Sequence, residues 1–591
     1  MKYSGARILI EALVEQGVDT IFGYPGGAVL FIYDELYKHS DRIRHILVSH
    51  EQHAAHAADG YARSTGKTGV CLATSGPGAT NLVTGIATAY MDSSPLVVIT
   101  GNVATGLLGK DSFQEVDIAG ITMPVVKHNW IVKDTAELAE IVREAFIVAK
   151  SGRPGPVLID IPKDITSITA EWIPSTHING KEVSASTENS TGSSKRFYMR
   201  NARATFSDSD IEQAVLMIRG SKYPFIYAGG GVISSGACDE LKAFAECINA
   251  PVALTLMGLG ALDCDHPLCT GMIGMHGTVA SNKAVQKTDL LITIGARFSD
   301  RVTSRADIFA RNAKVLQFDI DPAEINKNIK TNFEITGNVK HILRRILEEL
   351  KPESQASAAR QPDVSQAPSA VNEWHDEIAK WKAKIPKAHH RKTELHPRFI
   401  IEETAKRLGP AAIAVTDVGQ HQMWAAQFFP HKRPRAFLSS GGLGTMGFGL
   451  GAALGAKIAN PGNPVVLFTG DGSFRMNCPE LSTLAAYKIP VLIIIFNNKT
   501  LGMVRQWQRL FYEGRYSDTT LDRPPDFVKL GEAYHLNAYR ATDEDGFIKA
   551  LDAAINSLSS GKAALIDAVI DIDEMVLPMV PNGKPVDEQL L

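Results

Sequence analysis

Short apolar runs alternate with longer amphipathic stretches along this chain. The runs are rich in β-branched residues, and helical patterns of about ten or more residues separate most of them. This alternation is typical of parallel sheets built from β-α-β units. The runs predicted as strands are Ile46–Ser49, Gly69–Thr74, Leu96–Thr100, Val157–Ile161, Phe225–Ala228, Val252–Leu256, Leu290–Ile294, Val315–Ile320, Ala412–Thr416, Val465–Phe468, Val491–Phe496 and Ala564–Ile570.

Two polar stretches interrupt the alternation. His177–Lys195 and Pro352–Ala370 are rich in small polar residues and indicate linkers. The sequence therefore predicts an α/β fold of three parallel-sheet domains, and domains of similar size can share a topology although no internal sequence repeat is visible. The predicted division is 1–176, a linker at 177–197, 198–350, a linker at 351–372, and 373–591.

Composition narrows the class of protein. The 591 residues suffice for about three or four domains. The net charge of −3 and the absence of a basic stretch argue against nucleic-acid binding. No apolar run approaches the roughly 18 residues that span a membrane. The N-terminal segment is predicted as a helix capped by Ser4 rather than a signal peptide, and six cysteines without a CxxC pair fit free thiols in a cytoplasmic protein.

Two polar side chains follow consecutive apolar strands near the C-terminal end. Asp471 lies in Gly-Asp-Gly after one strand, and Asn498 follows the next. A lone Gly-Asp-Gly is more often an ordinary turn, and Asn pairs are common in loops. At the ends of two parallel neighbours, however, both side chains would meet at one sheet edge, where open α/β sheets bind ligands. A carboxylate and a carboxamide oxygen there suit Mg²⁺ shared with a diphosphate.

This stretch resembles the cofactor motif of thiamin diphosphate (ThDP) enzymes. A second block, with Glu51 ahead of a helical run and Thr74–Asn81 further on, resembles their pyrimidine-binding domain. In isolation Glu51 would be an ordinary first-turn helix residue. The resemblance implies that it is the catalytic carboxyl, hydrogen-bonded to the aminopyrimidine ring. We expect it to be buried, with a pKa raised by desolvation so that it exchanges a proton.

Nearly the whole chain is similar to the catalytic subunits of the acetohydroxyacid synthase family. The Glu and the Gly-Asp-Gly…Asn-Asn pattern are common to ThDP enzymes, whereas the segments around Met446 and Trp507 are more specific. The matching segments are Gly23–Val29, His50–Gln52, Tyr61–Arg63, Thr74–Asn81, Phe113–Glu115, Arg153–Asp164, Met275–Gly277, Gly295–Phe298, Asp300–Val302, Val418–Ala425, Ser440–Met446, Asp471–Phe474, Gly502–Phe511 and Val576–Pro581.

The resemblance implies three cofactors: ThDP, Mg²⁺ and FAD. The metal ligands would be Asp471, Asn498 and the main-chain oxygen of Thr500, while Met446 would hold ThDP in a bent form that makes proton transfer intramolecular. The other implied ThDP positions are Pro25, Gly419, Gln420, His421, Gly444, Gly470, Gly472 and Ser473. The implied flavin positions are Arg153, Gly229, Gly230, Gly231, Thr255, Leu256, Met275, His276, Gly295, Arg297, Asp319 and Ile320.

The glycine run at 229–231 is by itself a weak dinucleotide signal, and a tight turn after a strand explains it equally well. The family usually has two Asp residues where this chain has Ser299 and Asp300, which is a departure in the flavin domain.

The implied substrate pocket combines two groups of residues. Phe113, Gln114 and Lys163 would line the approach, and Met503 with Trp507 would complete the pocket. Taken alone, Trp507 would be a core or interface aromatic. In the family this Trp favours 2-oxobutyrate over pyruvate as acceptor, a preference of about 1–3 kcal/mol for one methylene.

The implied activity is decarboxylation of pyruvate and transfer of the hydroxyethyl unit to pyruvate or 2-oxobutyrate. The products, acetolactate or 2-aceto-2-hydroxybutyrate, belong to branched-chain amino acid biosynthesis. The implied partners are small 2-oxoacids, a second copy in a homodimer or homotetramer with shared active sites, and a small regulatory subunit, with no nucleic acid or membrane. The alternatives are a flavoenzyme of the pyruvate oxidase type and a non-catalytic flavoprotein.

Overall fold

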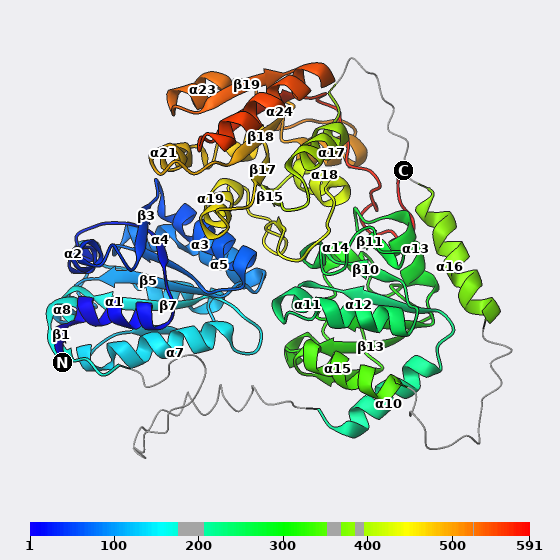
Figure 1. Cartoon of the computed structure of the whole chain (residues 1–591), viewed down its shortest axis with the longest axis horizontal. Helices are drawn as coiled ribbons and strands as arrows, with labels where there is room; N and C mark the ends of the chain where they lie inside the picture. Colours follow the sequence, from blue (N-terminus) through cyan, green and yellow to red (C-terminus); the bar gives the residue numbers. More distant parts are fainter. Residues whose placement is uncertain (175–205, 352–367, 385–394, 524) are drawn as a thin grey trace.

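The computed structural model describes residues 1–174, 206–351, 368–384, 395–523 and 525–591. It contains three six-stranded parallel sheets with helices on their faces, and the three α/β units lie at the corners of a triangle (Figure 1). The predicted α/β fold with three parallel sheets is confirmed. Most residues of the two predicted linkers lie outside the described residues, and the exact domain boundaries stay a prediction. No helix among the described residues is long and apolar enough to cross a membrane.

The N-terminal sheet has the strand order β3-β2-β4-β5-β7-β6. The N-terminal helix forms as predicted, with the Ser4 side chain accepting from the backbone N–H of Arg7. A small antiparallel pair, β1 (Lys2–Ser4) and β8 (Thr169–Glu171), closes this domain. The strands are β2 (Thr20–Tyr24), β3 (Arg44–Leu47), β4 (Gly69–Ala73), β5 (Leu96–Asn102), β6 (Asn129–Ile131) and β7 (Val157–Pro162). The α-helices are α1 (Gly5–Glu15), α2 (Leu30–Lys38), α3 (Glu51–Thr65), α4 (Pro77–Asn81), α5 (Val83–Met91), α6 (Ile118–Thr122), α7 (Leu138–Lys150) and α8 (Lys163–Ser167).

The central sheet differs, with the order β11-β10-β9-β12-β13-β14. Counted along the chain this is 3-2-1-4-5-6, the order of dinucleotide-binding folds. Its strands are β9 (Pro224–Ala228), β10 (Val252–Leu254), β11 (Cys269–Met272), β12 (Leu290–Ile294), β13 (Lys314–Asp319) and β14 (Phe333–Thr336). Its α-helices are α10 (Asp208–Arg219), α11 (Gly230–Ser234), α12 (Cys238–Cys247), α13 (Val279–Lys287), α14 (Asp300–Thr303), α15 (Val339–Leu350) and α16 (Pro368–Lys382), and the last packs on α13 with Trp374 in the central core.

The C-terminal sheet has the order β16-β15-β17-β18-β20-β19. Its inner strands β17 and β18 are buried along their whole length, as the continuous apolar runs predicted. The strands are β15 (Ile413–Thr416), β16 (Phe437–Leu438), β17 (Val465–Gly470), β18 (Leu492–Asn497), β19 (Asn537–Ala541) and β20 (Ala564–Val569). The α-helices are α17 (Pro397–Leu408), α18 (Gln420–Phe428), α19 (Gly449–Ala459), α20 (Asp471–Phe474), α21 (Leu481–Ala486), α22 (Gly502–Phe511), α23 (Phe527–Ala533) and α24 (Glu544–Ser559).

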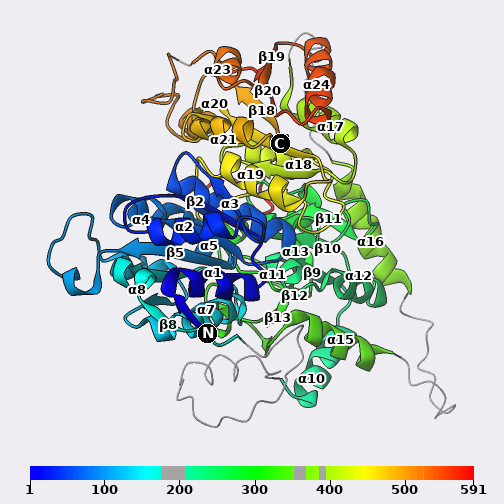
Figure 2. The same ribbon diagram turned by 60° about the vertical axis from the view of Figure 1, so that its left-hand side comes forward.

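The N-terminal and C-terminal domains meet through α3 and α19, which lie side by side in Figures 1 and 2. Small residues permit this close contact: a Cβ at Gly60 would lie 2.1 Å from the Ala452 carbonyl oxygen, and one at Gly455 would lie 1.8 Å from that of Ala57. Larger side chains would separate the helices. Because α3 begins at Glu51, this contact fixes the catalytic candidate relative to the C-terminal sheet.

Candidate functional site

Asp471 and Asn498 lie side by side at the carboxyl edge of the C-terminal sheet. Strands β17 and β18 pair in parallel, with Gly470 opposite Phe496, and each polar residue immediately follows its strand. Both side chains are buried. The prediction that they meet at one edge is therefore confirmed.

The Asp471 carboxylate has an unpartnered oxygen. Its Oδ1 accepts a hydrogen bond from the Gly472 N–H at 3.0 Å, but its buried Oδ2 has no hydrogen-bond partner in the described part of the chain. Burial raises the pKa of Asp471 to about 7. An isolated buried carboxylate oxygen is costly, and a divalent cation would satisfy it. Asn498 and Thr500 are buried within the same turn, so the predicted donor set fits Mg²⁺.

The segment Gly419–His421 lies at the point where the strand order of this sheet reverses, between β15 and β17. Gln420 is the first residue of the nine-residue helix α18, so free backbone N–H groups at this end suit an anion. The His421 ring packs against Gly470, where a Cβ would lie 2.9 Å from its Nδ1. Burial lowers the pKa of His421 to about 3, and its buried Nε2 has no partner among the described residues. These features fit a diphosphate.

The loop that carries Gly444 and Met446 is held by carboxylates that the sequence analysis missed. Asp417, directly after β15, accepts from the backbone N–H of Gly447 at 2.9 Å, and burial raises its pKa. Asp92 of the N-terminal domain accepts from the N–H groups of Gly441 and Gly442 at 3.0 and 2.7 Å. The position of Asp417 at a strand end was a signal that could have identified it. Met446 reaches toward Gly472, where a Cβ would lie 3.9 Å from its Cε.

Glu51 is the first residue of α3, and its Oε2 accepts from Asn81 Nδ2 at 2.9 Å. The contact joins the two parts of the block that resembles a pyrimidine-binding domain, Glu51 and Thr74–Asn81. Glu51 is half-buried in this chain, so the expected burial is not reached here. The fully buried Glu480 of the C-terminal domain accepts from the backbone N–H groups of Ser49 and His50 at 2.8 and 3.2 Å, which anchors the start of α3.

The predicted substrate residues form two separate groups. Phe113 is 89% exposed and Gln114 and Lys163 are also exposed, all at the carboxyl edge of the N-terminal sheet. Trp507 packs on Phe511 with 5.2 Å between ring centroids, and Met503 packs on the C-terminal core. No hydrogen bond, ion pair or ring contact within the described residues joins the two groups.

The predicted flavin residues collect at the carboxyl edge of the central sheet. The glycines there also serve packing, because a Cβ at Gly229 would lie 2.5 Å from the Gly295 carbonyl oxygen. Arg153 reaches this edge from the N-terminal domain and bonds Glu324 and Asp321 at 2.9 and 3.3 Å. The strand ends carry Gly229, Gly230 and Gly231 after β9, Thr255 and Leu256 after β10, Met275 and His276 after β11, Gly295 and Arg297 after β12, and Asp319 and Ile320 at the end of β13. This placement and the strand order fit a dinucleotide such as FAD.

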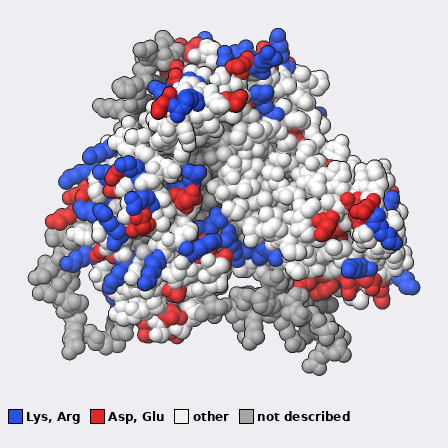
Figure 3. Space-filling view, turned by 180° about the vertical axis from the view of Figure 1, so that it is seen from behind, with Lys and Arg blue, Asp and Glu red and all other residues white. Residues whose placement is uncertain are grey.

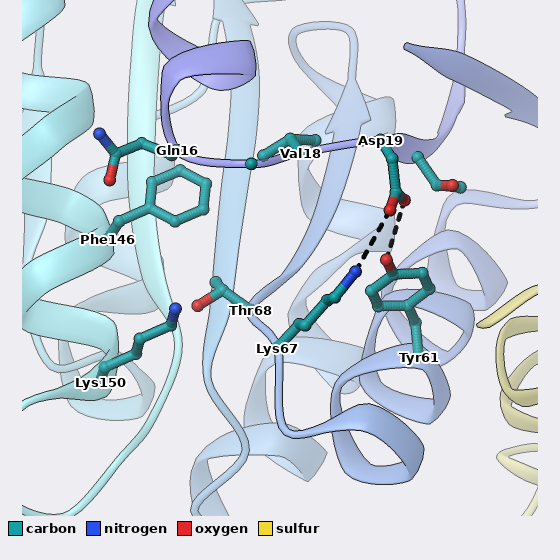
Figure 4. Close-up of a pocket in the computed structure, with 10 residues that line it drawn as sticks. Gln16, Val18, Asp19, Tyr61, Lys67, Thr68, Phe146 and Lys150 are labelled. Atoms are coloured by element: carbon teal, nitrogen blue, oxygen red, sulfur yellow. Dashed lines mark hydrogen bonds and ion pairs between the residues drawn. The ribbon is translucent and has the colours of Figure 1, made fainter. Parts of the chain in front are cut away.

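A different hollow, of about 220 Å³, opens at the opposite, amino edge of the N-terminal sheet (Figure 4). Lys67 and Tyr61 both point at Asp19, with Tyr61 donating at 2.8 Å and Lys67 at 3.4 Å. It is smaller than most ligand pockets, which exceed roughly 300 Å³. Asp19, Tyr61 and Lys67 bond one another there, and the small volume makes the hollow a weaker candidate for the cofactor site than the carboxyl edges.

Three thiamine pyrophosphate enzyme family descriptions match the chain: the N-terminal TPP binding domain at residues 3–121, the central domain at 211–346 and the C-terminal TPP binding domain at 417–568. Full-length relatives are similar too. The probable acetolactate synthase large subunit of Methanococcus aeolicus is 45% identical over 98% of this chain and 94% of its own length. The acetolactate synthase large subunit of Corynebacterium glutamicum is 47% identical over 98% and 89%. The isozyme 3 large subunit of Escherichia coli is 43% identical over 100% and 98%.

Proposed function

Because this chain belongs to the acetolactate synthase large-subunit family of thiamine pyrophosphate enzymes, we propose that it decarboxylates pyruvate and joins the two-carbon unit to a second 2-oxoacid. The observation that supports this most directly is the unpartnered, buried Oδ2 of Asp471 beside Asn498 at the carboxyl edge of the C-terminal sheet. The acceptor is pyruvate or 2-oxobutyrate, and the products are acetolactate or 2-aceto-2-hydroxybutyrate.

The residues of the chain bind and orient the cofactors. When bound, ThDP supplies the carbanion that adds to a keto group and the electron sink for decarboxylation. Asp471, Asn498 and the main-chain oxygen of Thr500 hold Mg²⁺, and the start of α18 receives the diphosphate. Glu51 would hydrogen-bond the aminopyrimidine ring and would supply the carboxyl for proton exchange with it. The residues at the carboxyl edge of the central sheet would hold FAD, which would serve a structural role there.

A second copy completes the substrate pocket in this proposal. The group around Phe113 is exposed at one edge of the chain and the group around Trp507 belongs to another domain. Figure 3 shows a broad surface with few charged side chains on the back of the molecule. Exposed apolar residues such as Leu107, Met123 and Leu30 also suit an interface. A homodimer is thus the minimum unit, a homotetramer is the larger form, and a small regulatory subunit binds because the relatives are named large subunits.

The direct test is product analysis. Purified protein is incubated with pyruvate, ThDP and Mg²⁺, with and without FAD and without an added electron acceptor. Acetolactate formed only when FAD is present, with the flavin remaining oxidised, supports the proposal. Acetate or acetyl phosphate with reduced flavin would contradict it in favour of an oxidase, and acetaldehyde alone would indicate a decarboxylase.

A further inference from the structure

The C-terminal strap, residues 574–580, joins the C-terminal domain to the central domain. After β20 the chain leaves the C-terminal sheet and runs to the central domain, where the C-terminus lies near α13 and α16 (Figure 1). The Val580 N–H donates to the Met275 carbonyl at 2.8 Å, and His276 Nδ1 lies 3.3 Å from the Pro578 carbonyl oxygen. One end of the strap therefore contacts the carboxyl edge of the central sheet, where the predicted flavin residues lie.

The other part of the strap is held by Gln506, the one fully buried residue of α22. Its Oε1 accepts from the Val576 N–H at 2.9 Å, and its Nε2 donates to the Val576 carbonyl at 3.1 Å and approaches Met579 Sδ at 3.3 Å. The side-chain amide thus forms with Val576 the same pair of donor and acceptor hydrogen bonds that the backbone of a neighbouring strand would form. Such a two-way contact requires a carboxamide, because both a donor and an acceptor are used.

Gln506 also contacts the predicted metal site through Gln420. Gln420 Nε2 donates to Gln506 Oε1 at 3.0 Å and to the Glu574 carbonyl at 2.7 Å. Gln420 Oε1 in turn accepts from Asn498 Nδ2 at 3.3 Å. Gly502 makes room for this contact, since a Cβ there would lie 2.0 Å from Gln420 Oε1. A continuous series of amide hydrogen bonds therefore connects the strap with a metal-ligand candidate.

The direction of these bonds has a chemical consequence. Asn498 uses its nitrogen toward Gln420, which turns its oxygen, the atom a divalent cation binds, to the other side. The nitrogen of Gln420 is fixed by two acceptors, and one of them belongs to the strap. If the strap leaves, Gln420 can rotate its amide, and Asn498 keeps only the contact of its Oδ1 with the Thr500 N–H at 3.3 Å.

We propose that Gln506 is a positioning residue that couples the C-terminal strap to the metal site, so that Mg²⁺ binds tightly only when the strap is docked. This inference rests on the proposed function, because it assigns Asn498 to the metal. Gln506 and the C-terminal strap would thus act on the metal site without contacting the metal ion themselves.

The experiment compares Gln506→Leu with Gln508→Leu in the full-length, FAD-loaded protein. Gln508 is a matched control on the same helix: its amide bonds Ser517 and Thr519, so it reaches the neighbourhood of Thr500 through Thr519 without contacting the strap. Two quantities are measured: the Mg²⁺ dissociation constant at saturating ThDP, from tryptophan fluorescence, and hydrogen exchange of the amides of residues 574–580. We expect Gln506→Leu to weaken Mg²⁺ binding about tenfold and to speed exchange, because buried partners lose their hydrogen bonds, while the control stays within about twofold.

Faster strap exchange with unchanged Mg²⁺ affinity would overturn the proposal, because Gln506 would then only anchor the strap. A lower melting temperature without a change in either quantity would overturn it as well. A second variant, Gln506→Glu, places a carboxylate oxygen opposite the buried Val576 carbonyl in place of the Nε2 donor, and the same two effects are expected at least at the size seen in Gln506→Leu. If the wild-type protein binds no Mg²⁺ with ThDP, the proposed function fails; if it does and the variants match it, only this inference fails.

Discussion

The N-terminal and C-terminal sheets have the same strand order but different carboxyl edges. Counted along each domain, both run 2-1-3-4-6-5. In both, the fourth strand ends in an Asn whose Nδ2 donates to an Asp in the sixth strand: Asn102 to Asp160 at 2.6 Å and Asn497 to Asp567 at 2.8 Å. The register is also the same, since each Asn lies opposite the residue two positions after its Asp. This equivalence was not visible as a sequence repeat.

The difference lies in the residues that follow the third and fourth strands. The strand pairing places Ser75 and Val103 of the N-terminal domain where the C-terminal domain has Asp471 and Asn498. The N-terminal edge therefore lacks both predicted metal donors. The shared fold thus supplies the position, and two side chains decide whether that position can bind a cation.

The largest expected effect comes from replacing Asp471 by Ser, the residue type that the N-terminal domain has at the equivalent position, Ser75. We expect Asp471→Ser to reduce acetolactate formation by at least about a hundredfold at ordinary Mg²⁺ concentrations, because the cation loses its charged ligand. A Mg²⁺ titration of the rate measures this. Asp160→Asn is the control at the other edge and should leave the Mg²⁺ dependence unchanged. Equal Mg²⁺ dependence in the wild type and Asp471→Ser would contradict the assignment.

A second substitution, at Glu51, tests the proposed contribution of the N-terminal domain, which is proton exchange. We expect Glu51→Gln to slow turnover about a hundredfold while ThDP affinity changes little, because the amide still forms a hydrogen bond but cannot exchange a proton. Steady-state rates and ThDP titration by fluorescence separate the two quantities. Near-normal turnover in Glu51→Gln would rule out the proton-transfer role.

The pH dependence of stability should differ between wild type and Asp160→Asn. Desolvation raises the pKa of Asp160 from 3.8 to about 6, and its partners Thr100 and Asn102 are neutral. Because the pKa is higher in the folded state, the contribution to stability is complete below 3.8 and is lost as the pH rises through about 6. We expect the variant to gain about 2 kcal/mol relative to wild type between about pH 4 and about pH 7. Urea unfolding at both pH values measures the gain, and a constant difference would refute the expectation.

The smallest effect distinguishes the two Asn–Asp contacts. Asn102→Ala leaves Asp160 with Thr100 as a neutral partner, whereas Asn497→Ala leaves Asp567 paired with Arg540 at 2.9 Å. We therefore expect Asn102→Ala to destabilise the protein by about 1 kcal/mol more than Asn497→Ala. The free energies of unfolding of both variants near neutral pH provide the comparison, and the reverse order would show that Arg540 does not compensate.

The sequence predicted the buried inner strands well and the sheet edges poorly. Strands such as β17 and β18 are continuous apolar runs, because both faces are covered. Among the missed strands, β6, β14 and β19 are half-exposed edge strands without such a run. The short strands β1, β8 and β16 and the largely buried edge strand β11 were missed as well. β3 was predicted two residues too late, and β2, with Gly23 inside it, was missed. Short or interrupted strands depend on tertiary pairing, which local patterns do not contain.

The site residues also divide into those that the local sequence predicts and those that depend on distant partners. Asp471, Asn498 and Glu51 could be predicted because each lies next to the end of a strand. Gln506 could not, although its neighbours Met503 and Trp507 were named, because its partners are the distant Gln420 and Val576. Glu480, whose partners precede Glu51, was missed for the same reason.

The antiparallel pair of β1 and β8 brings the two ends of the N-terminal domain together. Met1 and Trp172 exchange backbone contacts beyond the pair, with Trp172 N–H donating to the Met1 carbonyl at 2.6 Å. Ends that lie this close can be joined by a short peptide and the chain reopened at an exposed loop elsewhere. The N-terminal domain is therefore a candidate for circular permutation, which would allow Glu51 to be studied on a scaffold whose chain order has been changed.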